Sequence, residues 1–202
     1  IAVEEAMVET LRNKSNIAFL FVSSQNIDRI VSAYRACLKT NTVFIIDLYT
    51  AFILYKLAKV SKHIPQFNWK NIRVKYFKSH GDKLVKSGYK DLLYKFNKQK
   101  IEMTEIDPNK NKILMLLRDN CLFPVVVKNI RDIKGATVIY SMWEGYLTDK
   151  LKDYCRQNWI IIKQIHTSGH ATVNDLKSFA NAINPKTLIP IHTLDAQKYP
   201  AL

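Results

Sequence analysis

Apolar residues along this chain follow two spacings, which alternate from one segment to the next. A continuous apolar run of strand length lies at residues 17–22, and further strands are predicted over the largely apolar runs 42–46, 112–117, 136–141 and 159–164. The first two runs are rich in apolar and β-branched residues, which is typical of strands buried on both faces. The runs therefore predict a mostly parallel sheet.

Segments with helical spacing separate these runs. Ile27, Ile30 and Tyr34 predict the apolar face of a helix that begins near Asn26. Further helices are predicted at 2–12, 49–59, 145–154 and 172–183. The last helix begins at Thr172 and has Asp175 at its third helical position, as in a capping box.

The remaining segments are less regular. Residues 60–111 predict a strand around 73–77 and helices after Gly81 and Gly88, and residues 124–131 predict a short helix or strand. A final strand is predicted at 188–192. Alternation of strand and helix predicts an α/β fold, a mostly parallel sheet with helices on both faces, followed by a C-terminal strand–helix–strand portion.

Polar residues gather where the predicted strands end. These clusters are 23–26, Asp47, 141–143, 166–171 and 192–193. The carboxyl ends of parallel strands meet at one edge of a sheet, where ligands of α/β proteins bind. We therefore expect the functional site at this edge.

His170 is the first candidate for chemistry. It follows Ser168 and Gly169 at the start of a predicted helix, where small residues and a helix N-terminus favour a bound anion. A charged imidazole could donate to a phosphate oxygen or protonate a leaving alkoxide, and His166 could bind the same phosphate. The alternative is that His170 only caps the turn.

His192 follows an apolar strand, and neutral imidazole is a common zinc ligand. The alternative is a structural histidine held by hydrogen bonds. Ser23, Ser24 and Asn26 form a second strand-to-helix turn that is rich in short donors, a plausible second phosphate contact. The alternative for these three residues is ordinary N-capping.

Trp143 could stack on a base, although core packing is the commoner role of a lone tryptophan. Asp47 could bind a ribose hydroxyl or simply cap a helix. His63 and His80 have no assigned role beyond a solvated or RNA-facing position. Neither a Gly-x-Gly-x-x-Gly motif nor a Walker lysine loop occurs, which disfavours dinucleotide and NTP binding.

The 202 residues, 48% of them hydrophobic, can bury the core of one domain with a small attached piece. No apolar run reaches the roughly 18 residues of a membrane span. The three cysteines show no metal-type spacing, so we expect a reduced, cytoplasmic protein with no membrane partner. A homo-oligomer is compatible with the sequence.

The net charge of +14 is concentrated in the middle of the chain. Lysines and arginines between Lys56 and Lys100 alternate there with aromatic residues, a composition typical of grooves that bind single-stranded nucleic acid. The alternative is a soluble lysine-rich face whose aromatic residues pack in the core.

Five motifs carry a resemblance to a known family. They are 23–29 (SSQNIDR), 166–171 (HTSGHA), 175–176 (DL), 185–186 (PK) and 188–193 (LIPIHT). Together they resemble the β-CASP nucleases, metallo-β-lactamase-fold enzymes that include ribonuclease J and the cleavage factors that process mRNA 3′ ends. The resemblance extends over nearly the whole chain and is most specific after residue 165.

The resemblance implies roles for several residues. His170 would act near the scissile phosphate, and His192 would ligate one of two zinc ions in the intact enzyme. His166, Ser168, Gly169 and Ala171 would help to bind a nucleotide phosphate. RNA-directed members carry histidine at the position of His192, which favours single-stranded RNA as the substrate.

The chain departs from the family pattern in two places. It has no His-x-His-x-Asp-His motif, which the family carries in an upstream metallo-β-lactamase domain. The first β-CASP acid would fall just before Ile1, with Glu4 and Glu5 as the substitutes within the chain. We therefore expect residues 1–155 to form a β-CASP domain and 156–202 to join the absent metallo-β-lactamase domain.

The predicted function is part of a zinc-dependent, RNA-processing nuclease that hydrolyses phosphodiester bonds. This fragment alone is predicted to be inactive and to hold no zinc by itself. Two alternatives stay open at this point: a non-catalytic RNA-binding module and a DNA-directed nuclease of the same superfamily.

Overall fold

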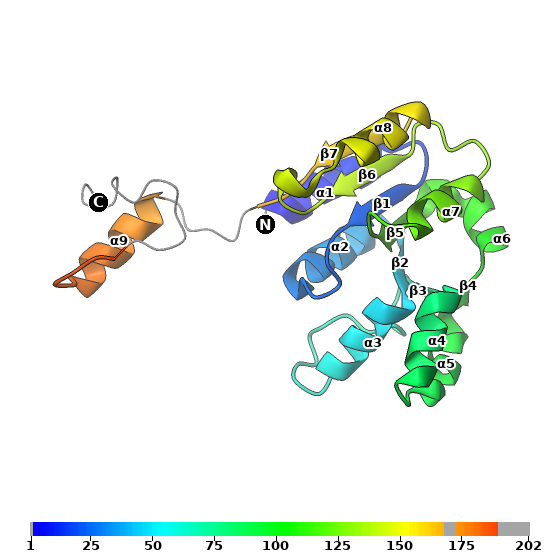
Figure 1. The fold of residues 1–202 in the computed structure, drawn as a ribbon, viewed down its shortest axis with the longest axis horizontal. Coiled ribbons are helices and arrows are strands. Elements are labelled where there is room, and N and C mark those ends of the chain that lie inside the picture. Colours follow the sequence, from blue (N-terminus) through cyan, green and yellow to red (C-terminus); the bar gives the residue numbers. More distant parts are fainter. Residues whose placement is uncertain (1, 168–172, 190–202) are drawn as a thin grey trace. The chain divides into compact units, whose positions relative to one another are not determined.

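The computed structural model describes residues 2–167 and 173–189. The chain divides into two compact units, Ile1–Thr167 and Ser168–Leu202. The first unit is built on a seven-stranded sheet in the order β4-β3-β2-β5-β1-β6-β7 (Figure 1). Every strand pair in this sheet is parallel. The predicted α/β fold with a mostly parallel sheet is confirmed.

Strands and helices alternate along the first unit. The strands are β1 (Ala18–Phe21), β2 (Val43–Asp47), β3 (Ile72–Lys75), β4 (Lys100–Ile101), β5 (Ile113–Leu117), β6 (Thr137–Tyr140) and β7 (Ile161–Gln164). The helices are α1 (Ala2–Asn13), α2 (Ile27–Lys39), α3 (Leu48–Leu57), α4 (Lys78–Lys86), α5 (Lys90–Phe96), α6 (Met103–Ile106), α7 (Leu122–Lys128) and α8 (Asp149–Gln157).

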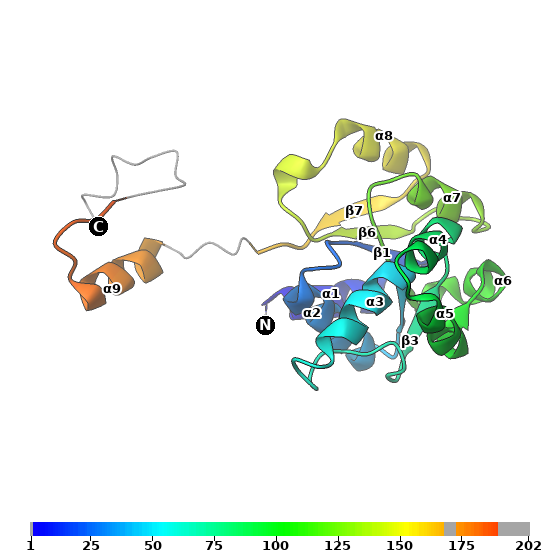
Figure 2. The same cartoon turned by 60° about the horizontal axis from the view of Figure 1, so that its bottom comes forward.

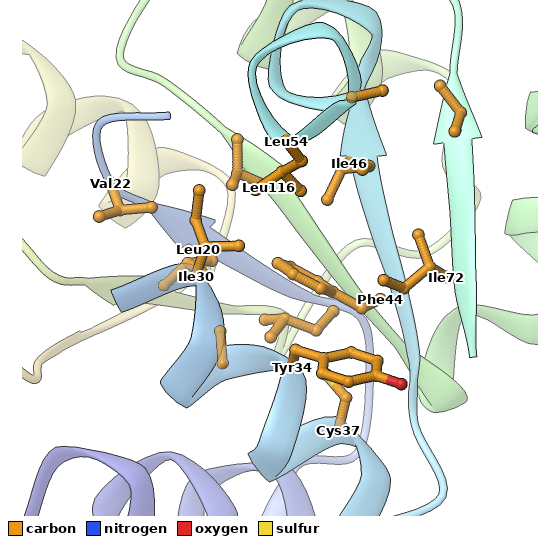
Figure 3. Packing of buried hydrophobic residues seen from close by; sticks show 14 of the residues in the cluster. Leu20, Val22, Ile30, Tyr34, Cys37, Phe44, Ile46, Leu54, Ile72 and Leu116 are labelled. Atoms are coloured by element: carbon orange, nitrogen blue, oxygen red, sulfur yellow. The ribbon is translucent and has the colours of Figure 1, made fainter. Parts of the chain in front are cut away.

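Successive strand residues point to opposite faces, so the sheet separates two hydrophobic clusters. On one face Leu20, Phe44 and Leu116 pack against residues of α1 to α5, and Figure 3 shows Ile30 of α2 beside Leu20. Both faces of the central strands are apolar because helices cover both. The uninterrupted apolar runs in the sequence have this physical cause.

The second face of the sheet is covered by α6, α7 and α8. Phe123 of α7 packs edge-to-face on Phe19 and Phe21, with ring centroids 5.2 and 4.9 Å apart. Figure 2 shows the two layers, with α8 on one side of β6 and β7 and with α1 and α2 on the other.

The direction of the chain through the sheet reverses at β1 and β5, which are neighbours. From β1 the chain passes over one face by α2 to β2, whereas from β5 it passes over the opposite face by α7 to β6. Such a reversal opens a crevice at the carboxyl ends of the two strands. Residues 22–24 follow β1 and Arg118 follows β5 at this point.

Several predicted boundaries are wrong. The helix expected after Gly81 begins three residues earlier, at Lys78, and the helix expected from residue 145 begins at Asp149 after a short 3-10 turn, Glu144–Tyr146. The short elements β4 and α6 were not predicted, because two- and four-residue elements leave no periodic signal.

The second unit contains α9 (Val173–Ile183), which confirms the predicted helix, while Thr172 lies outside the described residues. Leu188 and Ile189 are not in a strand, and the rest of the predicted strand at 188–192 lies outside the described residues. The division into functional segments at residues 155 and 156 stays a prediction, since β7 pairs with β6 inside the first unit.

Candidate functional site

The carboxyl edge of the sheet holds buried polar groups that lack a partner. Among the described residues, four buried side-chain atoms have no hydrogen-bond partner: His80 Nδ1, Arg118 Nε, Tyr140 OH and His166 Nδ1. Tyr140 ends β6, Arg118 follows β5, His166 follows β7, and His80 lies in the first turn of α4 after β3. Buried polar groups are normally paired, so their gathering at one edge marks it as the candidate site.

A network of side chains crosses the point where the chain direction reverses. Arg118 Nη2 donates to Ser24 Oγ, which joins the ends of β5 and β1. Ser24 Oγ also lies 2.7 Å from Thr50 Oγ1 at the start of α3. The Arg118 guanidinium stacks on the Tyr49 ring at 4.9 Å, so this cation is held on two sides.

Asp47 connects this network to His80. Its Oδ1 accepts a hydrogen bond of 2.7 Å from the Thr50 backbone N–H and so caps α3, as the capping alternative for Asp47 predicted. Its Oδ2 lies 3.6 Å from His80 Nδ1. A buried carboxylate thus faces a histidine across a gap slightly too long for a hydrogen bond.

Burial lowers the pKa of His80 below its ordinary value of 6.5. The carboxylate of Asp47 opposes this shift, whereas the positive charges of Arg118 and Lys83 add to it. The neutral imidazole is therefore the favoured form in the folded protein. A neutral histidine can accept a hydrogen bond as well as donate one.

The residues of the predicted second phosphate contact have structural partners. Asn26 caps α2 by accepting from the Arg29 backbone N–H at 3.1 Å, and Ser23 Oγ accepts from the Gln25 N–H at 3.2 Å. Ser24 is buried in the Arg118 network. Their proposed contact with phosphate stays a prediction. Asn26 and Ser23 instead accept local hydrogen bonds of the kind that the N-capping alternative predicts.

His166 lies two residues after β7 and is half-buried. Next to it, Thr167 Oγ1 accepts a hydrogen bond of 3.2 Å from Arg29 Nη2 of α2. Burial lowers the pKa of the Arg29 guanidinium from its usual value. The end of β7 therefore has a cation and an unpartnered imidazole close in sequence to the predicted phosphate-binding turn.

The other predicted site residues lie outside the described residues. They are His170, Ser168, Gly169, Ala171 and His192. Their roles in catalysis, phosphate binding and zinc binding stay predictions.

The basic middle stretch is a solvated surface with a largely buried aromatic interior. Phe67, Phe77 and Phe96 are buried, and of the aromatic residues in this stretch only Tyr94 is among the exposed large hydrophobic side chains. The lysines are exposed apart from Lys75, which pairs with Glu102 at 3.0 Å. The alternative that these aromatic residues pack in the core is therefore correct for most of them.

Trp143 differs from that pattern, because 61% of it is exposed and core packing is excluded. It follows β6 at the carboxyl edge and meets Tyr146 edge-to-face at 5.2 Å. A Cβ at Gly145 would lie 2.3 Å from the indole, so only glycine allows the ring to fold back over the chain there. Trp143 therefore offers an exposed aromatic surface that contacts the Tyr146 ring.

Arg118 was not among the predicted site residues, and His80 was predicted only as a solvated or RNA-facing residue. Arg118 directly follows an apolar strand, so the rule that selected Ser23 and Asp47 would also have selected it. His80 had no such signal, because it lies in the irregular stretch and reaches the site only through the packing of α4.

The described residues contain no group of three or more His, Cys, Asp or Glu side chains that could hold a metal ion. Zinc sites need three or four such ligands, so the described part of the chain does not fit a complete zinc site. None of the helices within 2–167 and 173–189 has the length and apolar character needed to cross a membrane.

Comparison with known proteins adds the family. Residues 161–199 match the model of the Zn-dependent metallo-hydrolase RNA specificity domain. The match begins at β7 and includes His166, residues 168–171, α9 and His192. No curated protein matches the chain. The match supports the resemblance to a β-CASP region of the metallo-β-lactamase nucleases, and residues 161–199 are similar to the RNA specificity domain of Zn-dependent metallo-hydrolases.

Proposed function

We propose that this chain is the RNA-binding part of a zinc-dependent ribonuclease. One observation carries the proposal: the family match at 161–199 covers the two motif histidines, His170 and His192, together with His166. The family description names both zinc dependence and RNA specificity, which are the two properties that the proposal joins.

The residues of this chain would have distinct tasks. The neutral imidazole of His192 would be one zinc ligand, with the other ligands supplied outside the described residues. Zinc bound in the intact protein would lower the pKa of a water molecule and polarise the phosphodiester. His170 would donate a hydrogen bond to the phosphate oxygen on which negative charge develops.

Two surfaces of the first unit would guide the RNA. The exposed lysines of α4, α5 and the preceding loop supply a positive field, consistent with the net charge of +14. Trp143 supplies an exposed ring on which an unstacked base could lie. Both surfaces suit a single strand, whose bases are free to stack.

The experiment is a zinc and nuclease assay on the full-length protein with His192→Ala, and His63→Ala as the control because His63 is exposed in the basic stretch. Loss of a metal ligand should cost more than the roughly 10–100-fold seen when a ligand's own partner is lost. We expect lower zinc content and a rate reduced by more than about 100-fold in His192→Ala only. Zinc content and rate equal to wild type in that variant would refute the proposal.

Competition between single-stranded RNA and DNA of the same sequence, at fixed salt, tests the substrate class. We expect RNA to displace DNA. Equal or stronger binding of DNA would instead support a DNA-directed nuclease.

A further inference from the structure

A cavity of about 520 Å³ lies beside the Arg118 network at the carboxyl ends of β2 and β5. Its walls are Tyr49, Phe52, His80, Lys83, Leu84, Ser87, Tyr89 and Arg118. This volume is within the range of about 300–1,000 Å³ that is usual for small-molecule sites. Among the described residues, none of those predicted to bind phosphate or zinc lines it, whereas His80 and Arg118 of the candidate site do.

The charges around the cavity favour an anion. Arg118 and Lys83 are cations in its wall, and His80 is held neutral by burial. The carboxylate of Asp47, which faces His80, is buried and caps α3. Arg118 Nη2 is already used by Ser24, but Nε has no partner among the described residues. A bound group that accepts hydrogen bonds would relieve this unpaired nitrogen.

The rest of the wall is aromatic. Phe52 and Tyr89 lie with ring centroids 4.9 Å apart, and Tyr49 carries the Arg118 guanidinium on one side. Lys56 Nζ is 4.1 Å from the centre of the Tyr89 ring, which adds positive charge behind this wall. A plain inorganic anion needs no aromatic wall, and a purely apolar ligand would leave the cations unused.

The combination of an aromatic wall, in which the Phe52 and Tyr89 rings are tilted by 57°, with cations points to a flat ring joined to an anionic group. We propose that the cavity binds one nucleotide, with its base against Phe52 and Tyr89 and its phosphate near Arg118 and Lys83. Within the proposed function, on which this assignment rests, the nucleotide is one unstacked residue of the bound RNA. Base–aromatic stacking contributes roughly 1–3 kcal/mol per base.

The test measures binding of uridine and adenosine 5′-monophosphate to the full-length protein by calorimetry, with inorganic phosphate as a third probe. Two variants change the wall without touching the Ser24–Arg118 bond: Tyr89→Leu and Lys83→Gln. Their matched controls are Tyr94→Leu, since Tyr94 is 68% exposed on α5, and Lys128→Gln, since Lys128 is exposed in α7 and does not line the cavity.

We expect Tyr89→Leu to weaken mononucleotide binding about fivefold or more, in line with the loss of one stacking contact, and Lys83→Gln to weaken it in a salt-dependent way. Both controls should bind as wild type does. Phosphate should bind more weakly than either mononucleotide, and an RNA oligonucleotide should displace the mononucleotide.

Two failures are distinguishable. An RNA oligonucleotide that binds with wild-type affinity to Tyr89→Leu and Lys83→Gln, together with no mononucleotide binding, overturns the cavity assignment and leaves the proposed function standing. Mononucleotide binding that depends on Tyr89 and Lys83, with no binding of RNA, supports the cavity and overturns the proposed function.

Discussion

The two edges of the sheet in the first unit are built differently. At the amino edge, residues in the left-handed region lie in the turns that lead into strands: Asn41 before β2, Asn71 before β3 and Trp159 before β7, with φ of 50°, 63° and 56°. Left-handed residues end helices tightly. The turns from α2 to β2 and from α8 to β7 are therefore short, whereas the connection from α3 to β3 is long.

Polar groups at the amino edge are also paired. The buried Asn16 side chain donates to Asp132 O at 2.8 Å and to Lys134 O at 3.0 Å, and its oxygen accepts from the Ile17 N–H at 2.8 Å. The carboxyl edge instead holds His80 and Arg118, whose buried nitrogens have no partner among the described residues.

The difference separates stability from binding. Satisfied hydrogen bonds and tight turns contribute free energy to folding, whereas unpaired buried groups reduce it and persist where a ligand uses them. The sheet strands are the same at both edges, so the chemistry is set by the turns that follow β1, β2 and β5. We expect substitutions at the amino edge to lower the free energy of unfolding, and substitutions at the carboxyl edge to weaken ligand binding.

The largest expected effect is on folding. Asn16→Ala removes a side chain that pairs with three backbone groups and should lower the free energy of unfolding by about 3 kcal/mol, at roughly 1 kcal/mol for each group. Urea denaturation measures this loss. Asn120→Ala is the control at the carboxyl edge, because the exposed Asn120 side chain accepts only from the Leu122 N–H, and it should cost less than about 1 kcal/mol. An equal decrease in the free energy of unfolding in the two variants would contradict the difference proposed between the two edges.

The second prediction concerns RNA binding. Trp143→Leu at the carboxyl edge should weaken binding of single-stranded RNA by roughly 1–3 kcal/mol, the contribution of one stacked base. Trp159→Leu is the matched control, since Trp159 is 68% exposed at the amino edge. Fluorescence titration with an RNA oligonucleotide measures both affinities. A larger loss of affinity in Trp159→Leu than in Trp143→Leu would indicate that RNA binds at the amino edge and would contradict the prediction.

The smallest expected effect is a pH dependence of stability. The folded protein lowers the pKa of His80 below 6.5 mainly by burial, so below pH 6.5 the unfolded chain binds a proton that the folded chain resists. Stability should therefore decrease as pH falls through this range, until pH passes below the folded pKa. Denaturation midpoints at pH values above and below 6.5 should converge in His80→Gln. An unchanged pH dependence in that variant would assign the effect to other groups.

Much of the fold could be predicted from the sequence. The apolar runs of β1, β5 and β6 are fully buried because both faces of the sheet are covered there, and that cause acts at each residue. The edge strand β7 is largely exposed, and its polar Lys163 and Gln164 fit that position. Boundaries were less well predicted around α4 and α8. Helix starts there depend on local turns such as Glu144–Tyr146, which carry no periodic signal.

The site was predicted only in part. Ser24 and Asp47 were found because they lie at the ends of predicted strands. The partners of Ser24, however, are 26 and 94 residues away in the chain, and Asp47 faces His80 of α4. Trp143 was expected in the core, since a lone tryptophan usually is, but 61% of it is exposed.

The sequence alone determined the parallel α/β class, the positive charge and the family motif at 161–199, because each depends on residue type and local spacing. Only the tertiary structure decided which groups meet at the carboxyl edge. His80 reaches Asp47, and Arg118 reaches Ser24, because the chain reverses direction between β1 and β5 and packs α3 and α4 on the same face. Contacts between distant segments depend on that packing, and spacing along the chain does not encode them.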